Sequence, residues 1–158
     1  MELNTVLKLV AAIMISELAG VLGSVFTIRA IPDWYATLKK PKLNPPGWVF
    51  GPVWTILYLL MGISAFLVWQ KGLGNTEVRI ALILFAIQLV LNALWSIVFF
   101  GWRRPLLAFA NIALMWLAII ATMISFLNIS LPAFYLLLPY IIWVSFAAYL
   151  NFAIVRLN

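Results

Sequence analysis

Three apolar segments of the chain carry large aromatic and amide side chains at helical spacing. Residues three, four and seven positions apart lie on one face of an α-helix. An amide in hydrocarbon costs free energy unless it is paired, so Gln88, Asn92 and Asn151 should face the interior of a helix bundle. The aromatic members of these faces could stack on a flat apolar ligand, and an aromatic protein core is the competing interpretation. The three faces are Trp54, Tyr58 and Met61; Gln88, Asn92, Trp95 and Phe99; and Tyr140, Trp143, Ala147 and Asn151.

One carboxylate also stands inside an apolar run. Glu17 shares a helical face with Gly20 and Ser24, and an ionisable group at that depth indicates function. The alternative is a protonated or amide-paired carboxyl that holds helices together. The chain has no cysteine and no histidine, which excludes disulfides, thiolate nucleophiles, histidine acid–base chemistry and the usual zinc and haem ligands. We therefore expect no metal site and no cofactor, and Glu17 alone is thin support for acid–base catalysis.

The composition places these segments in a lipid bilayer. Of 158 residues, 66% are apolar and 9% are charged, and the mean hydropathy is +1.14. A soluble domain carries roughly a quarter charged residues, whereas a spanning helix needs about 20 predominantly apolar ones. We predict an all-α integral membrane bundle of five transmembrane helices, forming a single domain over residues 1–158. The predicted spans are Thr5–Ile28, Trp48–Trp69, Ile80–Phe100, Leu106–Leu127 and Leu131–Val155.

The positive charges predict how the bundle is oriented. Lys and Arg are retained on the cytoplasmic side of a membrane. The side with more of them includes the long first loop, residues 29–47, so we place this loop and the carboxy terminus in the cytoplasm and the amino terminus outside. The net charge of +6 reflects these loop ends and does not indicate nucleic acid. The two sides carry Lys8, Lys71 and Arg79 against Arg29, Lys39, Lys40, Lys42, Arg103, Arg104 and Arg156.

The first span carries small residues at four-residue spacing. Small residues let helix backbones approach closely in lipid, where no hydrophobic force drives helices together. We expect this stripe to pack inside the bundle, and a homodimer contact is the alternative. The stripe consists of Ala12, Ser16, Gly20 and Ser24, with Ala19 and Gly23 beside it.

The most specific stretch of the sequence is residues 34–58, WYATLKKPKLNPPGWVFGPVWTILY. It closely resembles the signature of the translocator protein family, also called tryptophan-rich sensory proteins or peripheral-type benzodiazepine receptors. The match continues through three further segments at the expected spacing, so the resemblance covers nearly the whole chain. These segments hold Met61 and Gly62; Gln88–Asn92, Trp95 and Phe99–Gly101; and Leu138–Tyr140, Trp143, Phe146, Ala147, Leu150 and Asn151.

The resemblance implies a five-helix bundle whose long first loop, residues 29–47, is a lid over a ligand pocket. Family ligands are porphyrins such as protoporphyrin IX, haem-related tetrapyrroles, cholesterol in animal members, and synthetic isoquinoline carboxamides and benzodiazepines. The expected partners of this chain are therefore a tetrapyrrole and the bilayer. Carried over by motif position, the pocket should include Tyr35, Pro45, Trp54, Asn92, Phe99, Trp143 and Ala147.

Three functions fit the resemblance. The leading prediction is a membrane protein that binds tetrapyrroles in order to sense or carry them. The second is light- and oxygen-dependent breakdown of bound porphyrin, with Trp54 and Trp143 as redox-active walls, and the third is a scaffold that acts through partner contacts. Sterol binding is not favoured. The family's sterol pattern needs a short gap between a tyrosine and a basic residue, and six residues separate Tyr149 from Arg156 here.

Overall fold

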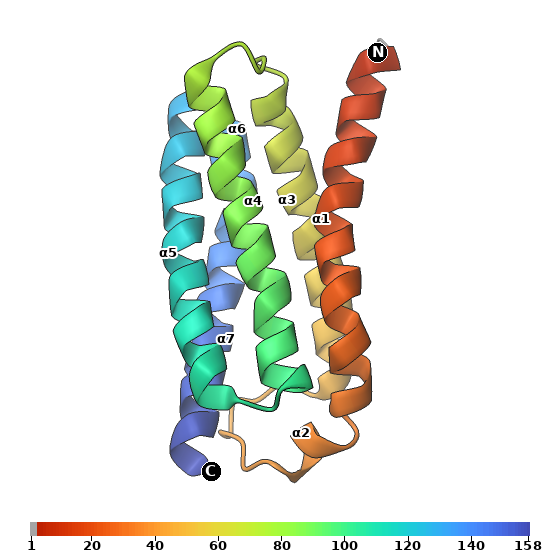
Figure 1. Ribbon diagram of the computed structural model, residues 1–158, viewed down its shortest axis with the longest axis vertical. Coiled ribbons are helices and arrows are strands. Elements are labelled where there is room, and N and C mark those ends of the chain that lie inside the picture. Colours follow the sequence, from red (N-terminus) through yellow and green to blue (C-terminus); the bar gives the residue numbers. More distant parts are fainter. Residues whose placement is uncertain (1–2) are drawn as a thin grey trace.

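The computed structural model describes residues 3–158, which form an upright bundle of helices (Figure 1). Within this range five helices are long and apolar enough to cross a membrane, which confirms the predicted class and number of spans. The five spans are α1 (Leu3–Ala30); the 3-10 turn η1 (Gly47–Val49) with α3 (Phe50–Trp69); α4 (Thr76–Ser96) with the π-helical turn η2 (Ile97–Gly101); α5 (Pro105–Ile129); and α6 (Leu131–Leu136) with α7 (Leu138–Leu157).

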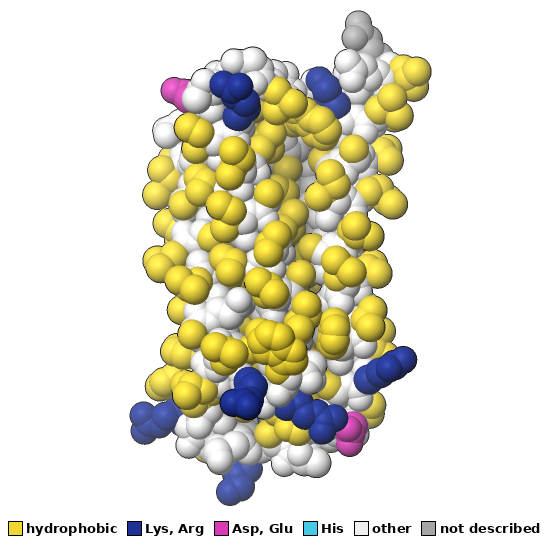
Figure 2. Space-filling model, in the orientation of Figure 1, with side chains coloured by type: hydrophobic (Ala, Val, Ile, Leu, Met, Phe, Trp, Pro, Cys, Tyr) yellow, Lys and Arg dark blue, Asp and Glu magenta, His cyan; other side chains and the backbone are white. Residues whose placement is uncertain are grey.

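The order of helices around the bundle differs from their order in the chain. α1 packs against α3 and α4, α4 packs against α5, and α5 packs against α7, while α6 and α7 close the ring against α3. Lys and Arg side chains gather at the two ends of the molecule, and hydrophobic side chains cover the height between them (Figure 2). This distribution suits a bilayer, because apolar side chains face lipid and cations lie at the interfaces.

The fifth span is not the continuous helix that its apolar run predicts. Pro139 lacks a backbone N–H and cannot continue the hydrogen bonding of the preceding turn, so the helix breaks at Leu137 between α6 and α7. The Leu137 N–H bonds to the carbonyl of Phe134 rather than that of Ala133. The freed Ala133 carbonyl accepts a hydrogen bond from Ser64 of α3 at 2.7 Å, so the break also ties α6 to α3.

The loop between α1 and α3 contains one short helix, α2 (Trp34–Thr37), and is attached to the bundle at two points. The buried Tyr35 ring packs against Phe99 and Phe100, with centroids 6.2 and 5.7 Å apart. Further along, the Lys39 backbone exchanges two hydrogen bonds of 3.0 Å with the Asn158 side chain. The loop therefore lies across the end of the bundle that holds the carboxy terminus (Figure 1).

The small residues of α1 pack inside the bundle, as expected from their spacing in the sequence. Gly20 lies against the Tyr58 ring so closely that no side chain fits there, and an added Cβ at Gly23 would lie 2.8 Å from the Ser96 hydroxyl. Nearer the amino terminus of α1, Gly62 of α3 lies against the α1 backbone at Ile13. Close approach of α1 to α3 and α4 thus depends on glycines from both sides. A homodimer contact through α1 stays a prediction.

Replacing Gly62 by alanine should separate α1 from α3 and destabilise the protein. The new Cβ would lie 2.6 Å from the Ile13 Cα, and backbone cannot move aside as a flexible side chain can. We expect a loss of about 1–3 kcal/mol, measured as a lower thermal unfolding midpoint in detergent. Gly51→Ala is the matched control, because Gly51 lies on the same helix with nothing within 4 Å of its added Cβ. An equal effect of both substitutions would contradict the close-packing account.

Candidate functional site

A cavity of about 380 Å³ lies between α1 and α3, at the end of the bundle nearer the first loop. The two helices touch at Gly20 and Tyr58 and at Ile13 and Gly62, and the cavity lies on the loop side of the first of these contacts. Val21, Ile28, Gly51 and Thr55 line it and are exposed, and Ser24 lines it and is half-buried, so it opens on the outer surface between the helices. Its remaining walls are Glu17, Gly20, Gly23, Thr27, Ile31, Gly47, Trp48, Phe50, Trp54, Tyr58, Trp95, Ser96 and Phe100.

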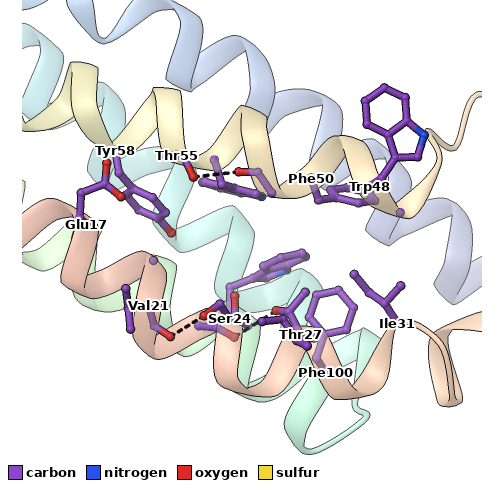
Figure 3. Close-up of a pocket in the computed structure, with 18 residues that line it drawn as sticks. Glu17, Val21, Ser24, Thr27, Ile31, Trp48, Phe50, Thr55, Tyr58 and Phe100 are labelled. Atoms are coloured by element: carbon purple, nitrogen blue, oxygen red, sulfur yellow. Dashed lines mark hydrogen bonds between the residues drawn. The ribbon is translucent and has the colours of Figure 1, made fainter.

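Aromatic rings from three elements form the inner walls of this cavity. Trp54 of α3 stacks on Tyr58 with centroids 5.5 Å apart. Trp95 of α4 meets the Phe100 ring of η2 edge to face at 5.8 Å. Figure 3 shows Glu17 and Tyr58 together at one end of the cavity and Trp48 at the other. The cavity is therefore mainly aromatic and apolar, with a carboxylate at its deep end.

Hydrogen bonds fix the orientation of Trp95. Its indole N–H donates to the Asn151 side-chain oxygen of α7 at 3.0 Å, and the Asn151 amide donates to the backbone carbonyl of Pro105 at 2.8 Å. Asn151 is buried, so the prediction that its amide faces the bundle interior is confirmed. Asn151 of α7 thus fixes the Trp95 ring, which forms part of the cavity wall although α7 itself does not line the cavity.

A second chain of hydrogen bonds begins at the Tyr58 wall and crosses the core. The Tyr58 hydroxyl donates to the Asn92 oxygen of α4, the Asn92 amide donates to the Tyr140 hydroxyl of α7 at 2.9 Å, and Tyr140 donates to Gln88 at 2.8 Å. All four side chains are at most 6% exposed. Gln88 and Asn92 therefore face the interior, as predicted, and their amides join three helices.

The structure distributes the predicted pocket residues over several environments. Trp54 lines the cavity, whereas the buried Asn92 lies behind it and contacts it through Tyr58. Ala147 belongs to the buried core around Tyr140. Pro45 lies half-buried in the first loop. Only one of these four thus borders the cavity directly.

The predicted residues Tyr35 and Phe99 meet at the loop end of the bundle, outside the cavity lining. The Tyr35 hydroxyl donates to the Asn44 side-chain oxygen at 2.7 Å, and Phe99 is 2% exposed. Burial raises the pKa of the Tyr35 phenol and outweighs the opposite effect of the Asn44 hydrogen bond, so the hydroxyl stays protonated and keeps this bond. The pair fixes the start of the loop to η2, and Lys40 lies 4.8 Å above the Tyr35 ring.

Trp143 lies on the other side of α3. It lines an apolar groove between α3 and α7 with Val53, Leu57 and Ile142 among others. Its indole nitrogen is buried and has no hydrogen-bond partner among residues 3–158, which leaves an N–H donor unused at a cost of about 1–3 kcal/mol. The Phe50 ring packs edge to face on Trp143, with centroids 6.2 Å apart, and also lines the cavity. Phe50 therefore stands between Trp143 and the cavity.

Sequence reasoning missed the contribution of α1 to the cavity. The small-residue stripe predicted packing, but Gly20, Gly23 and Ser24 also line the cavity wall. The π-helical turn η2 was missed as well, and its register shift brings Phe100 into the wall beside the buried Phe99. π-helical turns are frequent at functional sites. The sequence carries no recognised signal for this turn.

Comparisons with known proteins assign the chain to a family. A family model described as the TspO/MBR family matches residues 12–157. The chain belongs to the TspO/MBR family. It is 46% identical over 153 residues to the tryptophan-rich protein TspO of Chlorobaculum tepidum, with 97% of each chain covered. It is 44% identical to the Archaeoglobus fulgidus protein of the same name, covering 97% of this chain and 98% of that one.

Animal members of the TspO/MBR family match more distantly. The translocator protein of Bos taurus is 36% identical over 140 residues, which cover 88% of this chain and 83% of the bovine one. Together with the five apolar helices, the match makes this chain a multi-pass integral membrane protein of the TspO/MBR family.

Replacing Asn92 by leucine should destabilise the bundle. The substitution leaves the buried Tyr58 hydroxyl without an acceptor and takes one hydrogen bond from Tyr140. We expect a loss of about 1–3 kcal/mol, measured by thermal unfolding in detergent. Asn128→Leu makes the same chemical change at an exposed site and should alter stability by less than about 0.5 kcal/mol. Equal stability of Asn92→Leu and wild type would show that the network contributes nothing.

Proposed function

We propose that this protein binds porphyrins and related tetrapyrroles, such as protoporphyrin IX and haem, for tetrapyrrole sensing, transport or stress regulation. The observation that carries the proposal is the aromatic-walled cavity between α1 and α3, with Trp54 on its wall. A flat macrocycle gains mainly from stacking and apolar burial where no histidine can ligate a metal. The opening between the helices would admit an apolar ligand from the bilayer.

The proposed binding site extends beyond the cavity to Trp143. Phe50 separates Trp143 from the cavity, so rotation of this ring would bring Trp54 and Trp143 to one ligand. The buried indole N–H of Trp143 has no partner within the described part of the chain and would donate to a carbonyl or carboxylate of that ligand. Asn92 and Ala147 would support the site from the core, while Tyr35, Pro45 and Phe99 would support the loop, residues 29–47, as a lid over its end.

Trp54→Ala and Trp143→Ala should each weaken binding of protoporphyrin IX. At about 0.5–1.5 kcal/mol per aromatic contact beyond burial, we expect a several-fold loss for each, measured by fluorescence quenching of the detergent-purified protein in the dark. Trp102→Ala is the control, because Trp102 is exposed and lines neither the cavity nor the groove. Unchanged affinity in the Trp54/Trp143 double variant would contradict the proposed site. A loss in Trp54→Ala alone would confine the ligand to the cavity.

Light-driven breakdown of the porphyrin is the second candidate function. It is favoured by the stacking of Trp54 on Tyr58 beside the cavity, since neighbouring Trp and Tyr rings can share an oxidising equivalent generated by an excited ligand. The same purified samples test it when illuminated in air. Loss of the porphyrin absorption bands at the rate seen without protein would dismiss catalysis, and an accelerated loss that disappears in Trp54→Ala would establish it.

We propose that the first loop and the carboxy terminus face the cytoplasm. Seven Lys and Arg side chains belong to that end of the bundle, including Lys39, Lys40 and Lys42 of the loop. Each such cation favours the anionic inner leaflet by about 1 kcal/mol. The amino terminus would then lie outside.

Single cysteines test this orientation without background, because the chain has no cysteine of its own. Thr37→Cys lies in the exposed part of the loop, and Gly74→Cys lies between α3 and α4 with open space around its Cβ. A membrane-impermeant thiol reagent added to intact cells should label position 74 and spare position 37. The reverse pattern would overturn the orientation, and permeabilised cells, in which both positions should react, are the control.

A further inference from the structure

The carboxylate of Glu17 lies at the deep end of the cavity and is not used by the porphyrin proposal. It is 13 residues before the end of α1 at Ala30, about 20 Å along the helix axis. This position is near mid-membrane, where an ionised side chain is costly and is found mainly where it serves a ligand or an ion pathway. Among residues 3–158 no ion-pair partner reaches Glu17, and the ion pair found there joins Arg103 to Asp33.

The elements around Glu17 bring no other charge near it. α1 packs against α3, α4 and η2. α3 and η2 contain no Asp, Glu, Lys or Arg, and the charged residues of α4, Glu77 and Arg79, lie at its start, at the opposite end from the cavity. On α1 itself, Lys8 and Arg29 are about 13 and 18 Å away along the axis. The titratable group that faces Glu17 is the Tyr58 phenol, whose hydroxyl donates away to Asn92.

Aromatic rings line the cavity between this carboxylate and the first loop. The Tyr58 ring lies against α1 at Gly20, one turn from Glu17, and Trp54 stacks on it. Trp95 and Phe100 form the inner wall. The negative face of an aromatic ring attracts a cation, most strongly where water is excluded. One carboxylate and several aromatic rings in a mainly apolar cavity form a combination that suits an organic cation.

We propose that the cavity between α1 and α3 is also a binding site for lipophilic organic cations, whose charged nitrogen lies beside Glu17 and whose apolar part packs on the aromatic walls. Such a ligand would neutralise a carboxylate that no Lys or Arg of the described residues reaches. The opening between α1 and α3 leads to the bilayer, in which amphiphilic cations concentrate. The proposal does not depend on porphyrin binding. Glu17 would select a ligand that carries a positive charge, and the aromatic rings would bind its apolar part.

A pair of ligands that differ only in charge tests this proposal. Benzyltrimethylammonium and neopentylbenzene have the same shape, with a quaternary nitrogen in one and a carbon in the other. Their affinities are measured by calorimetry on the full-length protein in nanodiscs of zwitterionic lipid. Wild type should bind the ammonium at least about tenfold more tightly than the hydrocarbon, and Glu17→Gln should bring the two within about twofold by weakening the ammonium alone.

Glu77→Gln is the matched control, because it removes one carboxylate from the same chain at an exposed position away from the cavity. It should leave both affinities unchanged. The proposal is overturned if Glu17→Gln binds the ammonium like wild type, or if Glu77→Gln weakens it equally. It is also overturned if Glu17→Gln weakens neopentylbenzene to the same extent, since that result would indicate damaged packing. Protoporphyrin IX titrated into the same variants reports separately on the porphyrin site, so the two proposals can fail independently.

Discussion

The need to satisfy polar groups in an apolar medium organises this bundle. Tyr58, Asn92, Tyr140 and Gln88 are buried at the height of the hydrocarbon and bond to one another in a chain. Water cannot replace these partners in lipid, so separating α3, α4 and α7 would leave hydroxyls and amides unpaired. The network therefore fixes which faces of three helices meet, and it holds the Tyr58 ring on which Trp54 stacks at the cavity wall.

α1 is held differently, and the cavity results from that difference. It carries no side chain in the network and packs through small residues, which allow close approach at Gly20 and Gly62. Beyond Gly20 toward the loop, α1 and α3 border the cavity that opens to the outside. Because α1 contacts α3 through small residues and makes no hydrogen bond to the network, the two helices can separate near the loop without breaking one. This arrangement leaves a mainly apolar cavity in the protein without opening its polar core.

The aromatic residues of the family signature serve two different purposes in this structure. Trp54 and Trp95 present their rings to the cavity, while Tyr35 and Phe99 fix the loop to the end of the bundle. Trp143 faces a separate groove across Phe50. A ligand that contacts both Trp54 and Trp143 would require the Phe50 ring to move. The rotamer of Phe50 would then decide whether the cavity and the groove are connected.

The sequence by itself determined the class, the number of spans and which polar residues turn inward. Long apolar runs specify spanning helices because their backbone groups pair internally, and Gln88, Asn92 and Asn151 had to face the bundle interior since nothing in lipid could bond them. Only the tertiary structure decided which neighbours these side chains found. Helical spacing places Trp54 and Tyr58 on one face of α3 but does not say that α1 lies opposite them, because helix order around a bundle follows from packing between distant segments. The break at Leu137 and the π-helical turn at Ile97–Gly101 were likewise decided by the tertiary structure. At the π-helical turn, Phe100 lines the cavity, whereas the neighbouring Phe99 does not.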